Sequence, residues 1–373
     1  MSKFTVRSLR VALAVPLLMS TMTLMSASFA GSAGATTPSC TATGFVRDGL
    51  NLTAALVNPG RVSGDVNGTG CNIGIYFGSG TKGQVDHANV YGSNYYGIVN
   101  DGGNVKISNS NVHNIGETPF NGTQHGVGIY FSYDSGATGS ISNNTLSNYQ
   151  KGGIVVNGGN DSANITNNTV TGFGAINFIA QNGIQLAYGA SGSIVNNEVS
   201  GNAYTGANDA SSAGILVFGG CGDPQVTGVQ VQNNTLVNSD IGIYMANYDD
   251  TCATPSTVPT SNQINNNTIS NNAITNISGN DNGSLVQGYQ AGILDIGNRD
   301  VISNNTISGI GYTPAITVGP TFVIAIDTSF TTNVQLRNNN VGGDQKGGPG
   351  HDGKGHNGQH QGGSDGPGGH NDH

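Results

Sequence analysis

The side chains best suited to acid–base chemistry are concentrated in one short stretch, HNIGETPFNGTQHG, which spans residues 113–126. It contains His113, Glu117 and His125, and it is followed by Tyr130 and Lys151. Removing a proton beside a carboxylate needs a base and a cation that neutralises the carboxylate. His125 or Tyr130 could be the base, Lys151 the cation, and Glu117 could orient a histidine. Because exposed loops are rich in such residues, a purely structural loop is the alternative.

Two weaker patterns could bind metal ions. Asp249 and Asp250, next to Cys252, could hold calcium together with loop carbonyls, and so could Asp281 between Asn280 and Asn282. Neither has the spaced series of oxygen ligands that a dedicated calcium loop provides, so solvated loop acids are the alternative. The C-terminal histidines could bind zinc, copper or nickel weakly, or simply belong to a solvating tail; they are His351, His356, His360, His370 and His373.

Composition limits what can position these groups. Of the 373 residues, 60 are Gly, only 9% are charged and none is Trp, which fits neither a helical bundle nor a charged intracellular enzyme. The formal charge is -9, and no basic cluster lies outside the N-terminus. Nucleic acid and anionic membranes are therefore disfavoured as partners. We expect one elongated domain with a surface of Asn, Ser, Thr and Gly.

The N-terminus has the features of an export signal. Lys3, Arg7 and Arg10 precede an apolar run, and small residues follow it. This predicts a signal peptide over residues 1–35, cleaved after Ala30 or Ala35, with a membrane anchor as the alternative. A secreted or extracytoplasmic protein follows, with no membrane contact after signal removal. The four cysteines of the mature chain would then form two disulfides.

A hexapeptide typified by ISNNTL occurs eight times, and such a tandem unit predicts a solenoid. Its third residue is Asn in every copy. A short amide tolerates left-handed backbone angles and can bond the free backbone groups of a turn. We therefore expect a stacked amide ladder formed by Asn109, Asn143, Asn167, Asn196, Asn233, Asn266, Asn304 and Asn338.

A second short strand, marked by Gly-Ile pairs such as Gly97-Ile98, lies between successive hexapeptides. The shortest repeat, from Val90 to Val112, is 22 residues long. Compared with it, extra residues follow the hexapeptide at 113–128, 171–183, 200–214, 270–292 and 308–325.

Two insertions on the other side of the Gly-Ile strand, 216–235 and 244–268, contain Cys221 and Cys252. They occupy the same edge of adjacent coils, and strands of adjacent coils lie about 4.8 Å apart. This register predicts the disulfide Cys221–Cys252 and leaves Cys40–Cys71 as the second pair.

Coils of this length, with β-branched strands and Asn at a fixed turn, resemble the right-handed parallel β-helix of the pectate-lyase-like superfamily over roughly residues 60–341. The resemblance implies an all-β, single-stranded right-handed parallel β-helix of about nine coils, with three short strands in each. The solenoid would occupy residues 61–341, after a lead-in and cap over 36–60. Residues 342–373 contain no hydrophobe and should be disordered.

The resemblance also places a substrate groove between the insertions, with catalytic groups on the outward position of the Gly-Ile strands. That row is Tyr76, Val99, Tyr130, Val155, Gln185, Leu216, Tyr244, Leu294 and Asp327. Superfamily members that cleave uronates use clustered aspartates and a basic residue. The single Asp of this row cannot serve as both acid and base. Tyr76, Tyr130, Gln185 and Tyr244 are candidate sugar-binding residues, although aromatic residues are common in strands anyway.

Three functions remain. The favoured one is a secreted monomer that interacts with extracellular polysaccharide through the groove. The second is a polysaccharide lyase or glycoside hydrolase acting there, which the missing acids disfavour. The third is a structural rod, which the long insertions disfavour because a spacer would keep its coils near the minimum length. No sequence motif for an organic cofactor is present.

Overall fold

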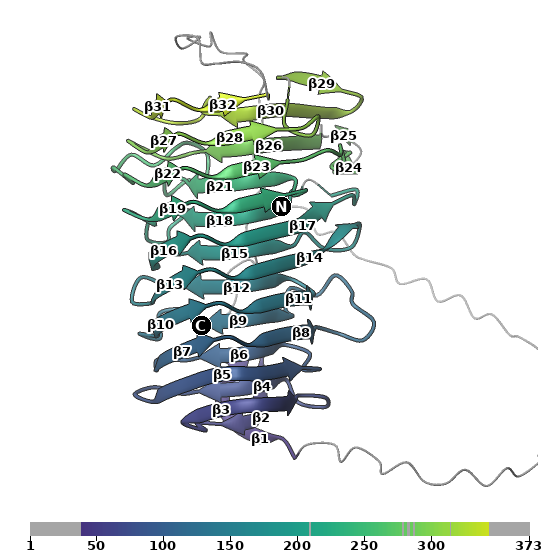
Figure 1. Ribbon diagram of the computed structural model, residues 1–373, viewed down its shortest axis with the longest axis vertical. Helices are drawn as coiled ribbons and strands as arrows, with labels where there is room; N and C mark the ends of the chain where they lie inside the picture. The colour runs from purple at the N-terminus through teal and green to yellow at the C-terminus, as the bar shows by residue number, and fades with distance from the viewer. Residues whose placement is uncertain are drawn as a thin grey trace, which may run out of the picture. The chain divides into compact units, whose positions relative to one another are not determined.

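The computed structural model describes residues 39–208, 210–277, 280–281, 284–285, 288–313 and 315–342. The predicted signal peptide and the tail histidines lie outside these residues. The described part contains strands and no helix, and hence nothing that could cross a bilayer as a helix. Short strands stack in register along one axis, as Figure 1 shows. The predicted all-β parallel β-helix is confirmed.

One sheet, here called sheet A, contains the Gly-Ile strands. The parallel members of this sheet are β2 (Leu50–Val57), β4 (Ile73–Phe77), β6 (Tyr96–Asn100), β9 (Val127–Phe131), β12 (Gly152–Asn157), β15 (Asn182–Ala187), β18 (Ala213–Gly219), β21 (Ile241–Asn247), β26 (Gly288–Asp295) and β30 (Thr321–Asp327). Antiparallel strands flank it, β1 (Thr41–Arg47) beside β2 and β29 (Ile316–Val318) beside β30. Each end of sheet A is thus partly covered by a hairpin.

The other sheet, sheet B, contains the hexapeptides, and the turn within each divides it into two columns. The first column comprises β7 (Asn104–Ser108), β10 (Thr138–Ser142), β13 (Ser162–Thr166), β16 (Ser191–Val195), β19 (Gln230–Gln232), β22 (Gln263–Asn265), β27 (Val301–Ser303) and β31 (Gln335–Arg337). The second comprises β8 (Asn111–Ile115), β11 (Thr145–Tyr149), β14 (Thr169–Ile176), β17 (Glu198–Tyr204), β20 (Thr235–Val237), β23 (Thr268–Ser270), β28 (Thr306–Ser308) and β32 (Asn340–Val341). Strands β3 (Arg61–Asn67) and β5 (Lys82–Tyr91) begin the sheet, and β24 (Asn280–Asp281) and β25 (Ser284–Leu285) form a separate antiparallel pair.

The core is a continuous apolar column inside the coil. It is built from the first and last residues of the hexapeptides, except the exposed Leu336, and from the Ile of each Gly-Ile pair. Packing explains why a glycine precedes the Ile of each Gly-Ile pair. A Cβ on Gly153 would lie 2.5 Å from the Gly183 carbonyl oxygen and 2.5 Å from Val170 Cγ1. The last hydrophobe of the hexapeptide packs in this way against glycine backbone in every copy but the last, which ends at Val341.

Replacing Gly153 tests this packing. Gly153→Ala should lower the free energy of unfolding by about 1–3 kcal/mol, because the new methyl group overlaps a carbonyl and a core side chain. Gly159→Ala is the matched control, since its nearest neighbours would be 3.8 Å away or more. Urea unfolding followed by circular dichroism measures both. Equal stability of the two variants would contradict the packing role.

The amide ladder lies one residue later than predicted. In every hexapeptide the third-position Asn, for example Asn143 or Asn196, has a positive φ and is exposed. This left-handed turn directs the fourth residue inward. The ladder is therefore formed by the buried Ser110, Asn144, Asn168, Asn197, Asn234, Asn267 and Asn305 and the half-buried Asn339. The constancy of Asn at the third position predicts a ladder there, but that constancy reflects the backbone angle.

The insertions lie where the register placed them. Those at 113–128, 171–183, 200–214, 270–292 and 308–325 all connect the second column of sheet B to the next strand of sheet A. The insertions that contain Cys221 and Cys252 connect sheet A to the first column of sheet B. Both predicted disulfides, Cys40–Cys71 and Cys221–Cys252, are present.

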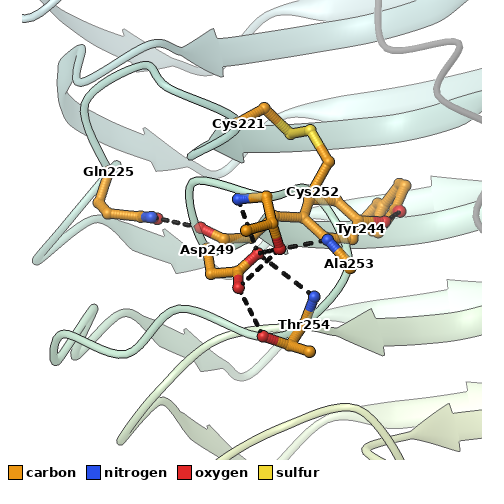
Figure 2. Close-up of a disulfide and its surroundings, with 9 residues drawn as sticks. Cys221, Gln225, Tyr244, Asp249, Cys252, Ala253 and Thr254 are labelled. Carbon is orange, nitrogen blue, oxygen red and sulfur yellow. Dashed lines mark hydrogen bonds between the residues drawn. A yellow bond between two sulfur atoms is a disulfide. The ribbon is translucent and has the colours of Figure 1, made fainter.

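Figure 2 shows the Cys221–Cys252 disulfide beside Asp249, one of the candidate calcium ligands. The Asp249 carboxylate accepts hydrogen bonds from the Thr254 hydroxyl at 2.7 Å and the Thr251 hydroxyl at 2.8 Å. It also accepts from the backbone N–H groups of residues 251, 253 and 254. These donors, the Thr254 hydroxyl first, lower the pKa of Asp249 to about 2. The carboxylate is therefore engaged in closing its own loop.

Candidate functional site

The loop between β8 and β9 brings Glu117 and His125 together. Their Oε1 and Nε2 atoms are 2.7 Å apart, so the carboxylate orients the ring as the sequence suggested. The His125 ring stacks on Tyr95 with centroids 3.8 Å apart, and its Nδ1 lies 3.9 Å from Asp48 Oδ2. His125 is buried, and both its ring nitrogens face carboxylates.

Asp48 reaches this cluster from the turn of the β1–β2 hairpin. Asp48 and Gly49 both have positive φ values, as the tight turn of a two-residue hairpin requires. Beside the turn, Phe45 packs over the outer face of sheet A, 6.3 Å from Tyr76 and 6.5 Å from Tyr130 between ring centroids. The hairpin therefore closes over the N-terminal part of the face on which the catalytic row was expected.

Gln150 holds the β8–β9 loop from the next coil. Its Oε1 accepts from the backbone N–H groups of Glu117 and Asn121, at 3.1 and 3.2 Å. Its Nε2 donates to the carbonyl oxygen of Thr123 at 2.8 Å and to the Thr123 hydroxyl at 2.7 Å. One buried amide thus fixes the loop that carries Glu117 and His125, and its position in the sequence gave no sign of this role.

The other two members of the predicted catalytic set have different surroundings. Lys151 donates from Nζ to the Ala180 carbonyl oxygen at 3.0 Å, and burial lowers its pKa to about 8. Tyr130 is buried and stacks on Tyr96 with centroids 4.8 Å apart. Burial raises the pKa of the Tyr130 phenol. The structure joins Glu117 to His125 but shows neither Lys151 nor Tyr130 in contact with them.

His113 lies outside this cluster. Its ring stacks on Tyr91 at 5.4 Å, and its Nε2 is 3.0 Å from Asn89 Oδ1.

The predicted row on sheet A is aligned coil by coil, from Tyr76 opposite Val99 to Leu294 opposite Asp327. Its side chains are nevertheless buried or half-buried. Tyr76 donates its hydroxyl hydrogen to Asp101 at 2.6 Å, and Gln185 donates to Asn157 at 3.0 Å. The hydroxyl oxygens of Tyr244 and Tyr248 are 2.6 Å apart.

Exposed aromatic side chains are found instead on the second of the expected groove loops, beside a half-buried one on the first. Phe173, at the bulge where β14 extends beyond its pairing with β11, is 52% exposed, and Phe178 in the following loop is 38% exposed. Phe120, on the β8–β9 loop, meets Phe173 edge to face with centroids 5.5 Å apart. Asn121, Gln124 and Asn177 lie exposed on the same two loops.

Sequence reasoning overlooked both Asp48 and these phenylalanines. The Asp48-Gly49 turn lies outside the repeat, but an Asp-Gly pair between alternating strands is itself a hairpin signal. The phenylalanines lie within the insertions that the repeat length revealed, but repeat length does not indicate which side chains of an insertion are exposed.

Among the described residues, no three His, Cys, Asp or Glu side chains gather closely enough to hold a metal ion. The side chain of Asp281, the second candidate calcium position, lies outside the described residues, as do the tail histidines.

Comparison with known proteins places the fold. A family model described as a right-handed beta helix region matches residues 64–254. Among solved structures, a mutant DFA-IIIase from Arthrobacter chlorophenolicus A6 in complex with DFA-III is similar, with 10% sequence identity and a TM-score of 0.41. That match covers 72% of this chain and 61% of the other, so the chain spans less than two thirds of its length. No curated protein matches. Because the family model covers more than half of the 373 residues, the chain belongs to the right-handed β-helix family.

Proposed function

We propose that this protein is a secreted binder of extracellular polysaccharide, and that it holds the glycan against the loops carrying Phe120, Phe173 and Phe178. The observation that carries the proposal is the exposure of Phe173 and Phe178 on one loop, beside the half-buried Phe120 of the adjacent loop. Exposed apolar patches bordered by polar residues often mark interaction sites.

The chemistry of the two loops fits a neutral or weakly charged sugar. A sugar ring has apolar C–H faces and a polar rim of hydroxyl groups. Aromatic faces can cover the former, and the exposed amides of Asn121, Gln124 and Asn177 can bond the latter. The remaining insertions between the second column of sheet B and sheet A would extend this binding surface along a longer glycan. The groove proposed from the sequence would then be lined by these loops, with the tyrosines of sheet A beneath.

Binding is better supported than catalysis. A general base needs a nitrogen or oxygen atom that can reach the substrate. In His125 one ring nitrogen bonds Glu117 and the other faces Asp48, so the ring connects the β1–β2 hairpin to the β8–β9 loop. Lyase or hydrolase activity by Glu117, His125, Tyr130 and Lys151 remains a prediction without a supporting contact beyond the first pair.

The binding proposal predicts that Phe173→Ala weakens affinity for whichever glycan the wild type captures on an array. Stacking contributes about 0.5–1.5 kcal/mol beyond area burial, so with the lost apolar area the dissociation constant should rise on the order of tenfold. Isothermal titration calorimetry with the glycan found on the array measures the change.

Phe330→Ala is the matched control, because Phe330 is also an exposed phenylalanine but lies beyond β30, on the opposite junction of the coil. It should bind as the wild type does. Capture of no glycan by the wild type, or equal affinity of the Phe173 variant, would count against the proposal. Release of unsaturated or reducing-end products from the captured glycan would favour the enzymatic alternative.

A further inference from the structure

The two ends of the solenoid differ in how they bury the core column. In the first column of sheet B, the inward residue of each strand is fully buried; these are Ile107, Ile141, Ile165, Ile194, Val231, Ile264 and Ile302. Leu336 of β31 is the next member of that column, since it pairs with Ile302. It is 51% exposed. The apolar column therefore reaches the surface at its C-terminal end.

At the N-terminal end the core column is covered. Val62 and Val66 of the first strand of sheet B, β3, are both buried in the core cluster. Ala55 and Leu56 of β2 pack against that cluster. Repeat proteins need such terminal caps, because an end coil exposes the apolar face that inner coils bury.

The backbone at the C-terminal end is open as well. Strand β31 pairs with β27 and β32 pairs with β28, and no other described strand pairs with either. Strand β29 covers only the Thr321–Val323 half of β30. An edge of this kind offers unpaired N–H and C=O groups to another strand.

Residues 343–373, which follow, offer no apolar side chain to cap this end. Residues 343–373 contain no Val, Leu, Ile, Met, Phe, Tyr or Ala. Burying Leu336 takes a hydrophobic surface, and a glycine- and histidine-rich segment has none.

We propose that the C-terminal end of the solenoid is a dimer interface, covered by the same end of a second copy of this chain. A closed two-fold pair fits the asymmetry of the ends, because head-to-tail stacking would place Leu336 against an end whose core is already covered, and would build a fibre. Two copies related by a two-fold axis pair their edge strands antiparallel. This proposal departs from the monomer that the sequence favoured.

The edge strand suits pairing with itself. In an antiparallel pairing centred on Leu336, the two leucines face each other and Arg337 lies opposite Gln335 of the partner subunit. No like charges oppose, and Arg337 already donates to Gln335 within its own strand. An amide opposite a guanidinium can accept a hydrogen bond from it.

Sedimentation velocity of the full-length protein over a concentration series tests the interface. The wild type should dimerise, and Leu336→Asp should raise the dimer dissociation constant on the order of 100-fold or more, because two apolar contacts are lost and two charges face each other. Ile310→Asp is the control, since Ile310 is 61% exposed but lies outside the core column. It should dimerise as the wild type does. Thermal unfolding monitored by circular dichroism confirms that both variants fold.

A second measurement fixes the register. The native cysteines of the described chain are paired, so Leu336→Cys introduces a single thiol. Across the two-fold axis it should form an intermolecular disulfide under mild oxidation, and Ile310→Cys should not. A monomeric wild type at every concentration, or undiminished dimerisation of the Leu336→Asp variant, overturns the proposal. The proposal is also overturned if the full-length protein is a monomer and dimers form only after residues 343–373 are removed, because the tail would then be the cap. None of these outcomes depends on glycan binding.

Discussion

Replacing Asn197 with alanine should lower the free energy of unfolding by about 3–5 kcal/mol, among the largest effects of any single amide substitution in this chain. Asn197 Nδ2 donates to the Ile165 carbonyl oxygen and to Asn234 Oδ1, each at 3.0 Å. Its Oδ1 accepts from Asn168 through the backbone N–H at 2.9 Å and the side-chain amide at 3.0 Å. Alanine leaves several of these groups buried without a partner, and each costs about 1–3 kcal/mol.

The neighbouring residue provides the control. Asn196 has a φ of 57° and is exposed, so it contributes a backbone conformation and no buried contact. Asn196→Gly should therefore change stability by only a few tenths of a kcal/mol, since glycine adopts left-handed angles freely. Urea unfolding curves of both variants measure the difference. If Asn196→Gly proved as damaging as Asn197→Ala, the ladder would lie at the third position after all.

This pair of asparagines also shows how far the sequence predicts the fold. Repeat spacing predicted the coil, the side of each insertion and the Cys221–Cys252 disulfide, because spacing along the chain converts directly into position in a solenoid. It could not separate Asn196 from Asn197, because both are asparagines and the difference is a backbone angle. The angle that exposes one residue buries the next.

The candidate site was less predictable, for a different reason. Glu117 and His125 belong to one loop, so their contact could be inferred from sequence proximity. Asp48 reaches His125 from a hairpin outside the repeat, and Gln150 reaches the loop from the next coil. Burial of the tyrosines on sheet A depends partly on Phe45, whose position follows from the fold of that same hairpin. The repeat spacing of the coil does not predict contacts made by the β1–β2 hairpin, because the hairpin lies outside the repeat.

The second large effect concerns a carboxyl group inside the coil. Asp295 ends β26 opposite Met245 of the core and is fully buried. Neither oxygen has a well-aligned hydrogen-bond partner among the described residues, and the N–H of Gly297, which lowers the pKa, is the smallest influence on this carboxyl group. Its neighbour is Asp300, which accepts from the Thr260 hydroxyl at 2.6 Å and the Asn262 N–H at 2.8 Å. With these donors Asp300 can hold the charge, and Asp295 then keeps a proton and donates it to Asp300.

Burial, followed by the charge of Asp300, raises the pKa of Asp295 to about 9. In the unfolded chain an aspartate loses its proton near pH 4. Between about pH 4 and 9 the folded state therefore binds one proton more than the unfolded state. The free energy of unfolding must therefore fall as pH rises through this window, with a limiting slope of about 1.4 kcal/mol per pH unit for one proton. Asp240 adds to the slope at lower pH, because burial raises its pKa to about 7.

Asp295→Asn should remove the contribution of this proton, since the amide N–H₂ can donate to Asp300 and does not titrate. The variant should gain stability relative to the wild type as pH rises, and about pH 8 it should be the more stable protein by about 1–3 kcal/mol. Urea unfolding from about pH 5 to 9 measures the difference. Asp250→Asn, a change in an exposed loop, is the control and should leave the pH slope of the wild type intact. A constant difference between Asp295→Asn and the wild type over this range would show that Asp295 is already ionised in the folded protein.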